Sequence, residues 1–379
     1  MADRRLTVLQ ILPALETGGV ERGTLEVAAA LVAAGHRSIV VSTGGRLVED
    51  LVAGGSEHVC LPVARKSPAT LLQVRPLRRL LQAEQVDILH ARSRVPAWVS
   101  WLAWRGMDVQ QRPRFVTTVH GLYSVNRYSA IMTRGERVIA VSDTARRYIL
   151  DNYPKVDPDK VVTIYRGVDP AEFPYGYKPS PDWLEDWYGA YPFLSGRKVL
   201  TLPGRLTRLK GHTDFINLIA DLVQAGVDVH GLIVGHLDPA RQSYINELRQ
   251  LVANRSLSGR ITFIGRRDDM RDIYAVSDMV LSLSNKPESF GRTVLEPLCM
   301  GVPAVGYGHG GVGEILARVY PPGRVPTGDR GRLAEGVMHL LQSPQPVPQC
   351  DALSRDAMLK STLELYRNLV NHPNDSTQA

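Results

Sequence analysis

The stretch of the chain that decides its fold is residues 282–311, SLSNKPESFGRTVLEPLCMGVPAVGYGHGG. The apolar run at 278–283 predicts a buried parallel strand, and a polar turn with proline and glycine follows it. Residues 293–300 then predict a helix, and residues 302–305 predict a second short strand. In open α/β sheets, a loop between a strand and a helix lies at the carboxyl edge, where ligands bind.

Two carboxylates bracket this expected ligand-binding loop. Glu288 lies on the loop and Glu296 lies on the helix, eight residues later. The free N–H groups at the start of a helix attract anions, and carboxylates accept hydrogen bonds from hydroxyl groups. An anion with hydroxyl groups on both sides suits this arrangement, and a nucleotide sugar is such a ligand.

These residues resemble a known family. Residues 288–296, ESFGRTVLE, resemble the E-x7-E segment of the retaining family 4 glycosyltransferases, and MGVPAV at 300–305 and GGVGE at 310–314 agree with it. The resemblance covers roughly residues 1–370. HARSRVPAW at 90–98 and HGLYS at 120–124 resemble bacterial enzymes of cell-envelope or lipopolysaccharide synthesis. It implies an α/β protein with the GT-B fold, in which two Rossmann-like, doubly wound domains face each other across a cleft.

Composition limits the partners of the chain. A length of 379 residues suits two domains, and a net charge of +7 predicts anionic partners. The three cysteines are far apart and form no C-x-x-C pair, which fits a reducing, cytoplasmic location and disfavours a zinc site. No RNA-binding motif or recognition helix supports nucleic-acid binding. The sequence contains no run of about 18 apolar residues, so it predicts no membrane-spanning segment.

Strands and helices alternate on both sides of a segment rich in proline, tyrosine and tryptophan. We therefore expect an acceptor-side domain at 1–170, a linker at 171–196 and a nucleotide-sugar-binding domain at 197–350. Residues 351–370 predict a last helix, which by the resemblance returns to the first domain. The polar residues 371–379 predict a disordered tail.

The donor side is predicted from three further segments. Arg205 and Lys210 lie in a glycine-bounded loop, GRLTRLKG, and two such cations can hold a diphosphate, although a basic surface turn remains the alternative. This loop resembles the family's G-R-x4-K-G motif. Gly18 and Gly19 separate the first strand from a helix and predict either a ligand-facing loop or a tight turn. They do not form G-x-G-x-x-G, which disfavours a dinucleotide site.

The acceptor side is predicted from charge and aromatic residues. Arg92 and Arg94 follow a strand and predict contact with an anionic acceptor, unless they pair with local carboxylates. Tyr123 and Tyr128 lie in a polar, aromatic loop that predicts an acceptor surface. The run at 65–79 has five basic and no acidic residues, interleaved with leucines. It predicts either a helix that contacts an anionic membrane peripherally or an ordinary solvated helix face.

His120, followed by a glycine, lies at the tip of a strand. Lone histidines are mostly structural, but this one resembles the family's histidine that touches the donor sugar near the reacting carbon. Arg166 stands where the family's N-G-V-D segment has asparagine, so no role is transferred to it. The Asp-Pro-Asp at 157–159 lies in a turn, where we expect a structural role.

The resemblance implies a retaining, metal-independent hexosyltransferase that uses no cofactor beyond its co-substrate, a nucleotide sugar that is UDP-linked in most of the family. The acceptor is then an envelope glycan, such as lipopolysaccharide core, or a lipid-linked glycan. Two alternatives are a nucleotide-sugar 2-epimerase, which shares the fold, and a non-catalytic protein that binds nucleotide sugars or membrane surfaces. The resemblance assigns catalysis to His120, Glu288, Arg205 and Lys210. It assigns donor binding to Gly18, Gly19, Arg205, Lys210, Gly265, Arg266, Glu288, Ser289, Phe290, Gly291, Thr293 and Glu296.

Overall fold

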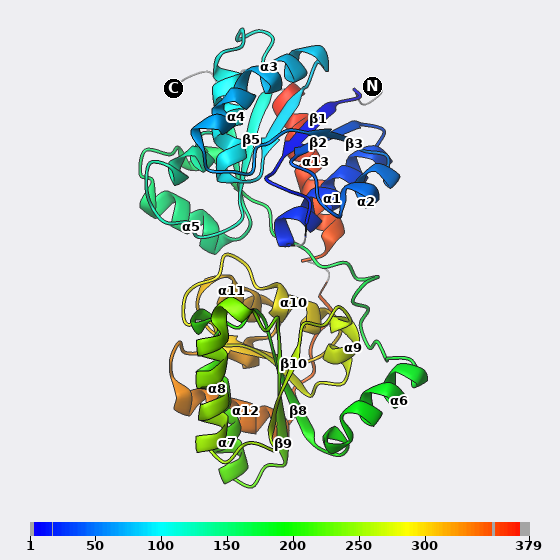
Figure 1. The fold of residues 1–379 in the computed structure, drawn as a ribbon, viewed down its shortest axis with the longest axis vertical. Coiled ribbons are helices and arrows are strands. Elements are labelled where there is room, and N and C mark those ends of the chain that lie inside the picture. The colour runs from blue at the N-terminus through cyan, green and yellow to red at the C-terminus, as the bar shows by residue number, and fades with distance from the viewer. Residues whose placement is uncertain (1–3, 17, 351–352, 372–379) are drawn as a thin grey trace. The chain divides into compact units, whose positions relative to one another are not determined.

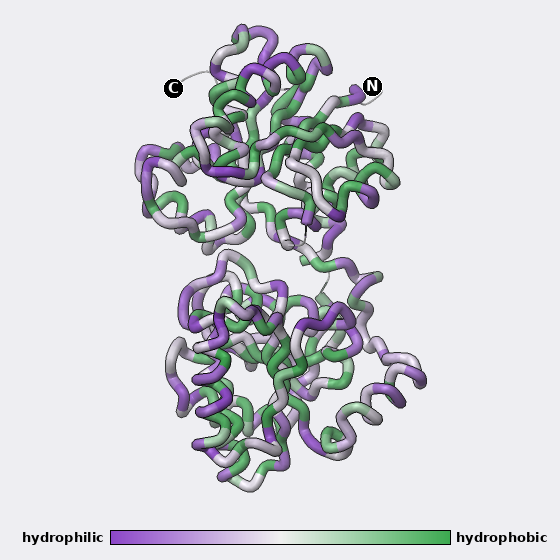
Figure 2. The backbone as a smooth tube through the Cα atoms, in the orientation of Figure 1, coloured by the Kyte–Doolittle hydropathy of each residue, from purple (hydrophilic) through white to green (hydrophobic). Residues whose placement is uncertain are grey.

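The computed structural model describes residues 4–16, 18–350 and 353–371. It divides into two compact units (Figure 1). The first unit contains the residues up to 166 together with those from 356 onward, and the second contains residues 167–355. Each unit is built on a parallel sheet with helices, and the apolar strands lie at its centre (Figure 2).

The first unit has a seven-stranded sheet in the order β3-β2-β1-β4-β5-β6-β7, and all of its pairs are parallel. The central strands are buried on both faces, which explains why they read as continuous apolar runs. Its strands are β1 Thr7–Ile11, β2 Arg37–Ser42, β3 Glu57–Cys60, β4 Ile88–Ala91, β5 Arg114–Val119, β6 Arg137–Ala140 and β7 Val161–Thr163. Its helices are α1 Gly19–Ala33, α2 Val48–Ala53, α3 Val74–Ala83, α4 Arg94–Arg105, α5 Asp143–Asn152 and α13 Arg355–Asn371, with short 3-10 turns η1 Pro68–Gln73, η2 Ser129–Thr133 and η3 Pro158–Lys160.

The second unit has a six-stranded sheet in the order β10-β9-β8-β11-β12-β13, again with parallel pairs. Its strands are β8 Lys198–Pro203, β9 Val229–Val234, β10 Ile261–Gly265, β11 Met279–Ser282, β12 Ala304–Tyr307 and β13 Arg324–Val325. Its helices are α6 Pro181–Ala190, α7 His212–Gln224, α8 Gln242–Asn254, α9 Met270–Ala275, α10 Arg292–Cys299, α11 Gly310–Val319 and α12 Arg330–Gln342. Both units therefore have the doubly wound architecture that the sequence predicts.

The strand order of each sheet marks where a ligand binds. In the first unit the order reverses between β1 and β4, and in the second it reverses between β8 and β11. At such a switch point the two neighbouring loops leave in opposite directions and open a crevice at the carboxyl edge. The loops concerned are 204–211 after β8 and 283–291 after β11, so the second switch point coincides with the two segments that the sequence singled out.

The boundaries of several elements differ in detail from those expected. The helix expected at 293–300 is α10 at Arg292–Cys299, and the strand expected at 302–305 is β12 at Ala304–Tyr307. The segment expected as a linker lies in the second unit, because Trp187 on α6 and Leu194 pack in one core cluster with β8 and β9. Of the expected tail, residues 372–379 lie outside the described part of the chain.

Helix α13 completes the core of the first unit, as Figure 1 shows in red. Tyr366 is fully buried, and its hydroxyl lies 2.6 Å from Nδ1 of His90 on β4. The other ring nitrogen of His90 lies 2.6 Å from the Thr118 hydroxyl on β5. Burial, helped by nearby Arg92, holds the pKa of His90 well below its ordinary value, so the ring is neutral. These contacts tie the end of the chain to two central strands.

Among the described helices, none combines the length and the apolar character that crossing a bilayer requires.

We expect Tyr366→Phe to destabilise the first unit. The change leaves a buried ring nitrogen of His90 without its partner, which costs about 1–3 kcal/mol of unfolding free energy. Urea unfolding of the two proteins measures the difference. Lys360→Ala, at an exposed position of the same helix, serves as the control and changes stability by less than about 0.5 kcal/mol. Equal stability of Tyr366→Phe and the parent protein would contradict the role of this contact.

Candidate functional site

An ion pair lies at the switch point of the second unit. Nζ of Lys210, at the end of the loop after β8, lies 2.8 Å from Oε1 of Glu288, on the loop after β11. Both side chains are about one quarter exposed, so the pair is partly shielded and still reachable by a ligand. The two residues are 78 positions apart in sequence, and only the adjacency of β8 and β11 brings them together.

Gly211 makes this approach of two loops possible. Its φ of 73° lies in the left-handed region, and a Cβ atom there would lie 1.9 Å from the carbonyl oxygen of Leu283. The amide of Asn285 also donates to the carbonyl of Leu209 at 2.9 Å, and the Asn285 side chain donates to the carbonyl of Arg208 at 3.0 Å. The loops after β8 and β11 are therefore joined backbone to backbone beside the ion pair.

The Glu288 carboxylate is held from its other side as well. The hydroxyl of Ser284 donates to Oε1, and the ring of His309 donates to the carbonyl of Ser284 at 2.7 Å. The amide of Gly311, in the first turn of α11, donates to the carbonyl of Glu288 at 2.7 Å. A Cβ at Gly311 would lie 2.5 Å from Cα of Phe290, so this close packing requires glycine.

Glu296, the second carboxylate of the motif, lies on α10. It accepts hydrogen bonds from Arg292 Nε at 2.9 Å and from the Tyr274 hydroxyl at 3.1 Å, and its side chain is 12% exposed. Burial and the neighbouring Glu296 raise the pKa of Tyr274 well above its ordinary value, so the hydroxyl stays a donor. Glu296 is therefore a hydrogen-bond acceptor that its neighbours hold in a fixed position on α10.

The other residues predicted to bind the donor divide into buried and exposed positions. Phe290 is buried and Gly291 caps α10, whereas Ser289 and Thr293 are half-buried beside them. Arg205 is exposed on the loop after β8, and Arg208, which the sequence analysis did not assign, points outward to pair with Glu247 at 2.6 Å. Gly265 ends β10 with a φ of 73°, and Arg266 is exposed and pairs with Asp268 at 3.0 Å.

In the first unit, Gly18 and Gly19 form the start of α1 and are exposed. The guanidinium of Arg166 donates to the carbonyl of Gly19, and it fills the space where a Cβ of Gly23 would lie. Arg166, the residue that departs from the family pattern, therefore covers the first turn of α1. This leaves the exposed outer side of the glycine pair as the part that a ligand can reach.

His120 follows β5 and lines a small cavity of about 20 Å³ together with His90, Arg92 and Arg166. Burial and the charges of Arg92 and Arg166 hold the pKa of His120 well below its ordinary value. The ring is therefore neutral at pH 7 and offers one donor and one acceptor, not a positive charge. The cavity holds about one water molecule.

The four residues predicted to bind the acceptor do not all lie on one surface. Arg92 is only 3% exposed and donates to the Gln10 side chain, because it follows β4 directly and turns into the sheet edge. Arg94 instead begins α4, and its guanidinium carbon lies 4.6 and 5.3 Å from the ring centres of Tyr123 and Tyr128. An acceptor cannot reach Arg92 on the surface that Arg94 and the two tyrosines form.

Two further residues join Arg94 and the tyrosines, and the sequence analysis had not grouped them with the acceptor. Nζ of Lys66 lies 4.3 Å above the ring of Tyr128, and the indole of Trp98 donates to the Tyr128 carbonyl at 3.0 Å. In the sequence, Lys66 stands out only as part of the basic run at 65–79, and nothing in the local pattern points to Trp98. Trp98 is half-buried, with one side facing this surface.

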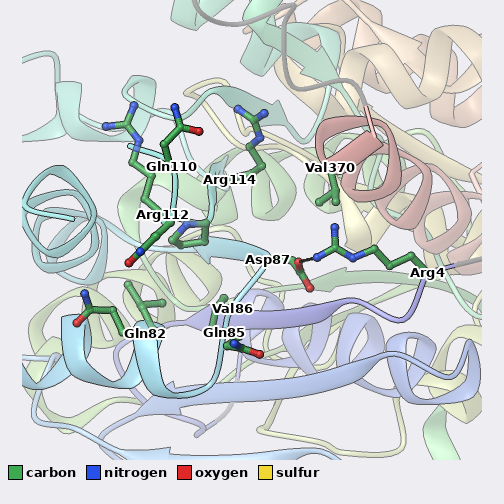
Figure 3. A pocket seen from close by; sticks show the side chains of 12 residues that line it. Arg4, Gln82, Gln85, Val86, Asp87, Gln110, Arg112, Arg114 and Val370 are labelled. Carbon is green, nitrogen blue, oxygen red and sulfur yellow. Dashed lines mark hydrogen bonds and ion pairs between the residues drawn. The ribbon is translucent and has the colours of Figure 1, made fainter. Parts of the chain in front are cut away.

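A larger polar pocket lies at the opposite, amino edge of the first sheet (Figure 3). Its arginines are already engaged: Arg4 pairs with Asp87 at 2.6 Å, Arg114 pairs with Glu136 at 2.9 Å, and Arg112 lies over the ring of Trp104. Because ligands of doubly wound sheets bind at the carboxyl edge, we do not assign the reaction to this pocket.

Comparison with known proteins agrees with the geometry. The model of Glycosyltransferase Family 4 matches residues 17–172, and that of glycosyl transferases group 1 matches residues 186–358. A solved glycosyltransferase from Rickettsia africae ESF-5 is 31% identical, covers 97% of this chain and 99% of its own, and has a TM-score of 0.86. The chain belongs to glycosyltransferase family 4. This glycosyltransferase has the GT-B fold.

Two other relatives of this glycosyltransferase carry informative names. N-acetyl-alpha-D-glucosaminyl L-malate synthase of Bacillus anthracis is 28% identical over 275 residues, which are 71% of this chain and 66% of that protein. The Anabaena protein HepE, solved in complex with UDP and glucose, is 21% identical, with a TM-score of 0.73 over 96% of this chain and 95% of that one. The second likeness shows a shared fold.

We expect Gly211→Ala to destabilise the glycosyltransferase more than Gly226→Ala does. Both glycines have left-handed backbones, with φ of 73° and 82°, but a Cβ at Gly226 would meet no atom within 4 Å. Gly226→Ala therefore costs about 1–2 kcal/mol of backbone strain alone, and Gly211→Ala adds about 1–3 kcal/mol for the clash with Leu283. Urea unfolding measures both. Equal losses would show that the two loops separate freely.

We also expect an acid-dependent loss of stability in the second unit. Burial lowers the pKa of His212, at the start of α7, to about 4, whereas the unfolded value is about 6.5. The stability contributed by the neutral ring is therefore complete above pH 6.5 and is lost as the pH falls toward 4, by about 3 kcal/mol in total. His212→Asn flattens this profile in urea unfolding. His236→Asn, at an exposed position, does not, and an unflattened profile for His212→Asn would refute the assignment.

Proposed function

We propose that this glycosyltransferase transfers a hexose from a UDP-linked sugar to an anionic cell-envelope acceptor, with retention of anomeric configuration. The observation that carries the proposal is the Lys210–Glu288 pair, 2.8 Å apart at the switch point of the second unit. A cation that can neutralise a diphosphate lies beside a carboxylate that can hold sugar hydroxyls. A donor nucleotide sugar needs both groups, one at each side of its reacting bond.

The unused hydrogen-bonding capacity of the pair supports this role. The Lys210 ammonium has three N–H donors, and its bond to Glu288 uses one, so two can bind phosphate oxygens. The bonds that Lys210 and Ser284 make to Glu288 both use Oε1, which keeps Oε2 for a ligand hydroxyl. Both groups can therefore bind the donor without separating from each other.

The chemistry follows from the charge that develops when the bond to the sugar breaks. The leaving diphosphate gains negative charge, which Lys210, Arg205 and the N-terminus of α10 stabilise. Glu296 holds the ribose hydroxyls, and neutral His120 takes the family's role of a hydrogen-bonding group for the donor sugar. Attack from the face that the diphosphate leaves, with the diphosphate accepting the acceptor's proton, retains the configuration without an enzyme nucleophile. No metal ion is required in this scheme.

The nucleotide base of the donor and the nature of the acceptor are proposed from the names of similar proteins and from the charge of this chain's surface. The HepE complex with UDP and glucose supports a UDP-linked donor. The name of the L-malate synthase supports an anionic acceptor, and so do Lys66 and Arg94 beside the two tyrosines. A lipopolysaccharide core or a lipid-linked glycan has this character. Arg75 and Arg79 are exposed on α3, and they support peripheral contact with the inner face of an anionic membrane.

The first test is to incubate the protein with UDP-glucose, UDP-N-acetylglucosamine and GDP-mannose, each with a bacterial envelope extract, in buffer containing EDTA. We expect UDP release that depends on the extract, persists in EDTA and yields an α-linked product by NMR. Release of GDP alone, or a β-linked product, would overturn the donor or the retention. A protein that binds UDP but releases none under any condition would be the non-catalytic alternative, and interconversion of free UDP-sugars would be the epimerase.

Variants test the two residues that carry the proposal. Lys210→Ala and Glu288→Ala each remove a contact that strengthens as the diphosphate leaves, so each lowers kcat/KM about 10²-fold or more, or about 3 kcal/mol. Glu247→Ala is the control. It breaks the exposed ion pair with Arg208, which lies on the same loop as Lys210, and it changes kcat/KM less than about twofold. Full turnover by either alanine variant of the Lys210–Glu288 pair would refute its role.

A further inference from the structure

An apolar groove of about 320 Å³ opens beside Arg94 and the tyrosines of the first unit. It lies at the carboxyl edge of the sheet, because Lys66 follows β3, Val95 is in the first turn of α4 after β4, and Tyr128 is on the loop after β5. This is the edge from which His120 extends. Its lining includes Lys66, Leu71, Val95, Trp98, Val99 and Tyr128.

The groove has an apolar interior and a cationic rim. Leu71 on η1 faces Val95, Trp98 and Val99 on α4 across it. Leu71 is 51% exposed, so the groove leaves an apolar contact unfilled, and an apolar ligand would remove this surface from water. At the rim, Lys66 is exposed beside the ring of Tyr128, and the guanidinium carbon of Arg94 lies 5.3 Å from the centre of the same ring. A single ligand can therefore place an apolar part inside and an anionic part at the rim.

We propose that this groove binds the hydrocarbon chain of an anionic amphiphile, whose phosphate contacts Lys66 and Arg94. The inference rests on the proposed function: it makes the sugar acceptor a lipid that carries a phosphate group. Two cations beside one aromatic ring, next to an apolar groove, match the two halves of such a molecule in charge and polarity. Small acids lack the chain that the groove would cover.

Contact with the surface of a membrane would involve a different set of residues. Leu72 is 73% exposed and does not line the groove, and Arg75 and Arg79 are exposed on α3 away from it. A surface that lies on a bilayer would use these residues at least as much as Leu71 and Lys66. Leu71 and Leu72 therefore form one matched pair for a test, and Lys66 and Arg79 form another.

The test is isothermal titration of the full-length protein with monomeric dodecyl phosphate, octyl phosphate, inorganic phosphate, malate and dodecyl maltoside. We expect dodecyl phosphate to bind about tenfold or more tightly than octyl phosphate, because each further methylene leaves water. Phosphate and malate bind much more weakly, and so does the neutral maltoside. Equal affinity for phosphate and dodecyl phosphate would overturn the proposal, and so would equal affinity for the phosphate and maltoside amphiphiles.

Variants locate the binding. Leu71→Ser and Lys66→Gln each weaken dodecyl phosphate binding about fivefold or more, whereas Leu72→Ser and Arg79→Gln change it less than twofold. If Leu72→Ser and Arg79→Gln weaken binding as much as Leu71→Ser and Lys66→Gln do, the amphiphile binds to the exposed surface of η1 and α3 and not in the groove. The groove proposal then fails. Binding to phosphatidylglycerol vesicles, measured with the same four variants, reports the membrane contact separately.

The thermal shift caused by UDP in the same samples separates this inference from the proposed function. A normal UDP shift without dodecyl phosphate binding overturns the groove alone, because the donor residues lie in the other unit. Binding of dodecyl phosphate without any UDP shift overturns the nucleotide-sugar donor, and with it the reading of the amphiphile as an acceptor.

Discussion

The backbone contact between the loops after β8 and β11 is the constraint on which the candidate site depends. Gly211 lets one loop lie against the carbonyl of Leu283, and no side chain fits between them. Because of this contact, Lys210 and Glu288 meet at 2.8 Å although they stand on different loops. The same principle acts on the far side of Glu288, where Gly311 packs on Phe290. Glycines thus fix a charged pair that a longer side chain would push apart.

In the first unit, polar side chains are buried at the carboxyl edge of the sheet. His90 satisfies both ring nitrogens with hydroxyls from β5 and α13, and burial keeps it neutral. His120 is neutral for the same reason and lies beside two arginines, Arg92 and Arg166. The edge is therefore positively charged through its arginines and not through its histidines, a distribution that persists across physiological pH.

The two units present surfaces of different chemical character. The second unit presents fixed carboxylates and a lysine, which suit the hydroxyls and phosphates of a donor. The first unit presents aromatic rings, cations and an apolar groove, which suit a larger and more varied partner. Family membership fixes the fold and the class of reaction.

The sequence by itself determined the alternation of strands and helices, the doubly wound class and the segments around Lys210, Glu288 and Glu296, because period, turn residues and motif spacing are local properties. Only the tertiary structure decided which of these residues meet. Lys210 reaches Glu288 because β8 and β11 are neighbours, and Arg92 parts from Arg94 because one residue follows a strand inward and the other begins a helix. Lys66 and Trp98 lie beside Arg94 and the two tyrosines for the same reason. Contacts between residues far apart in sequence depend on strand order and side-chain direction, which local patterns do not encode.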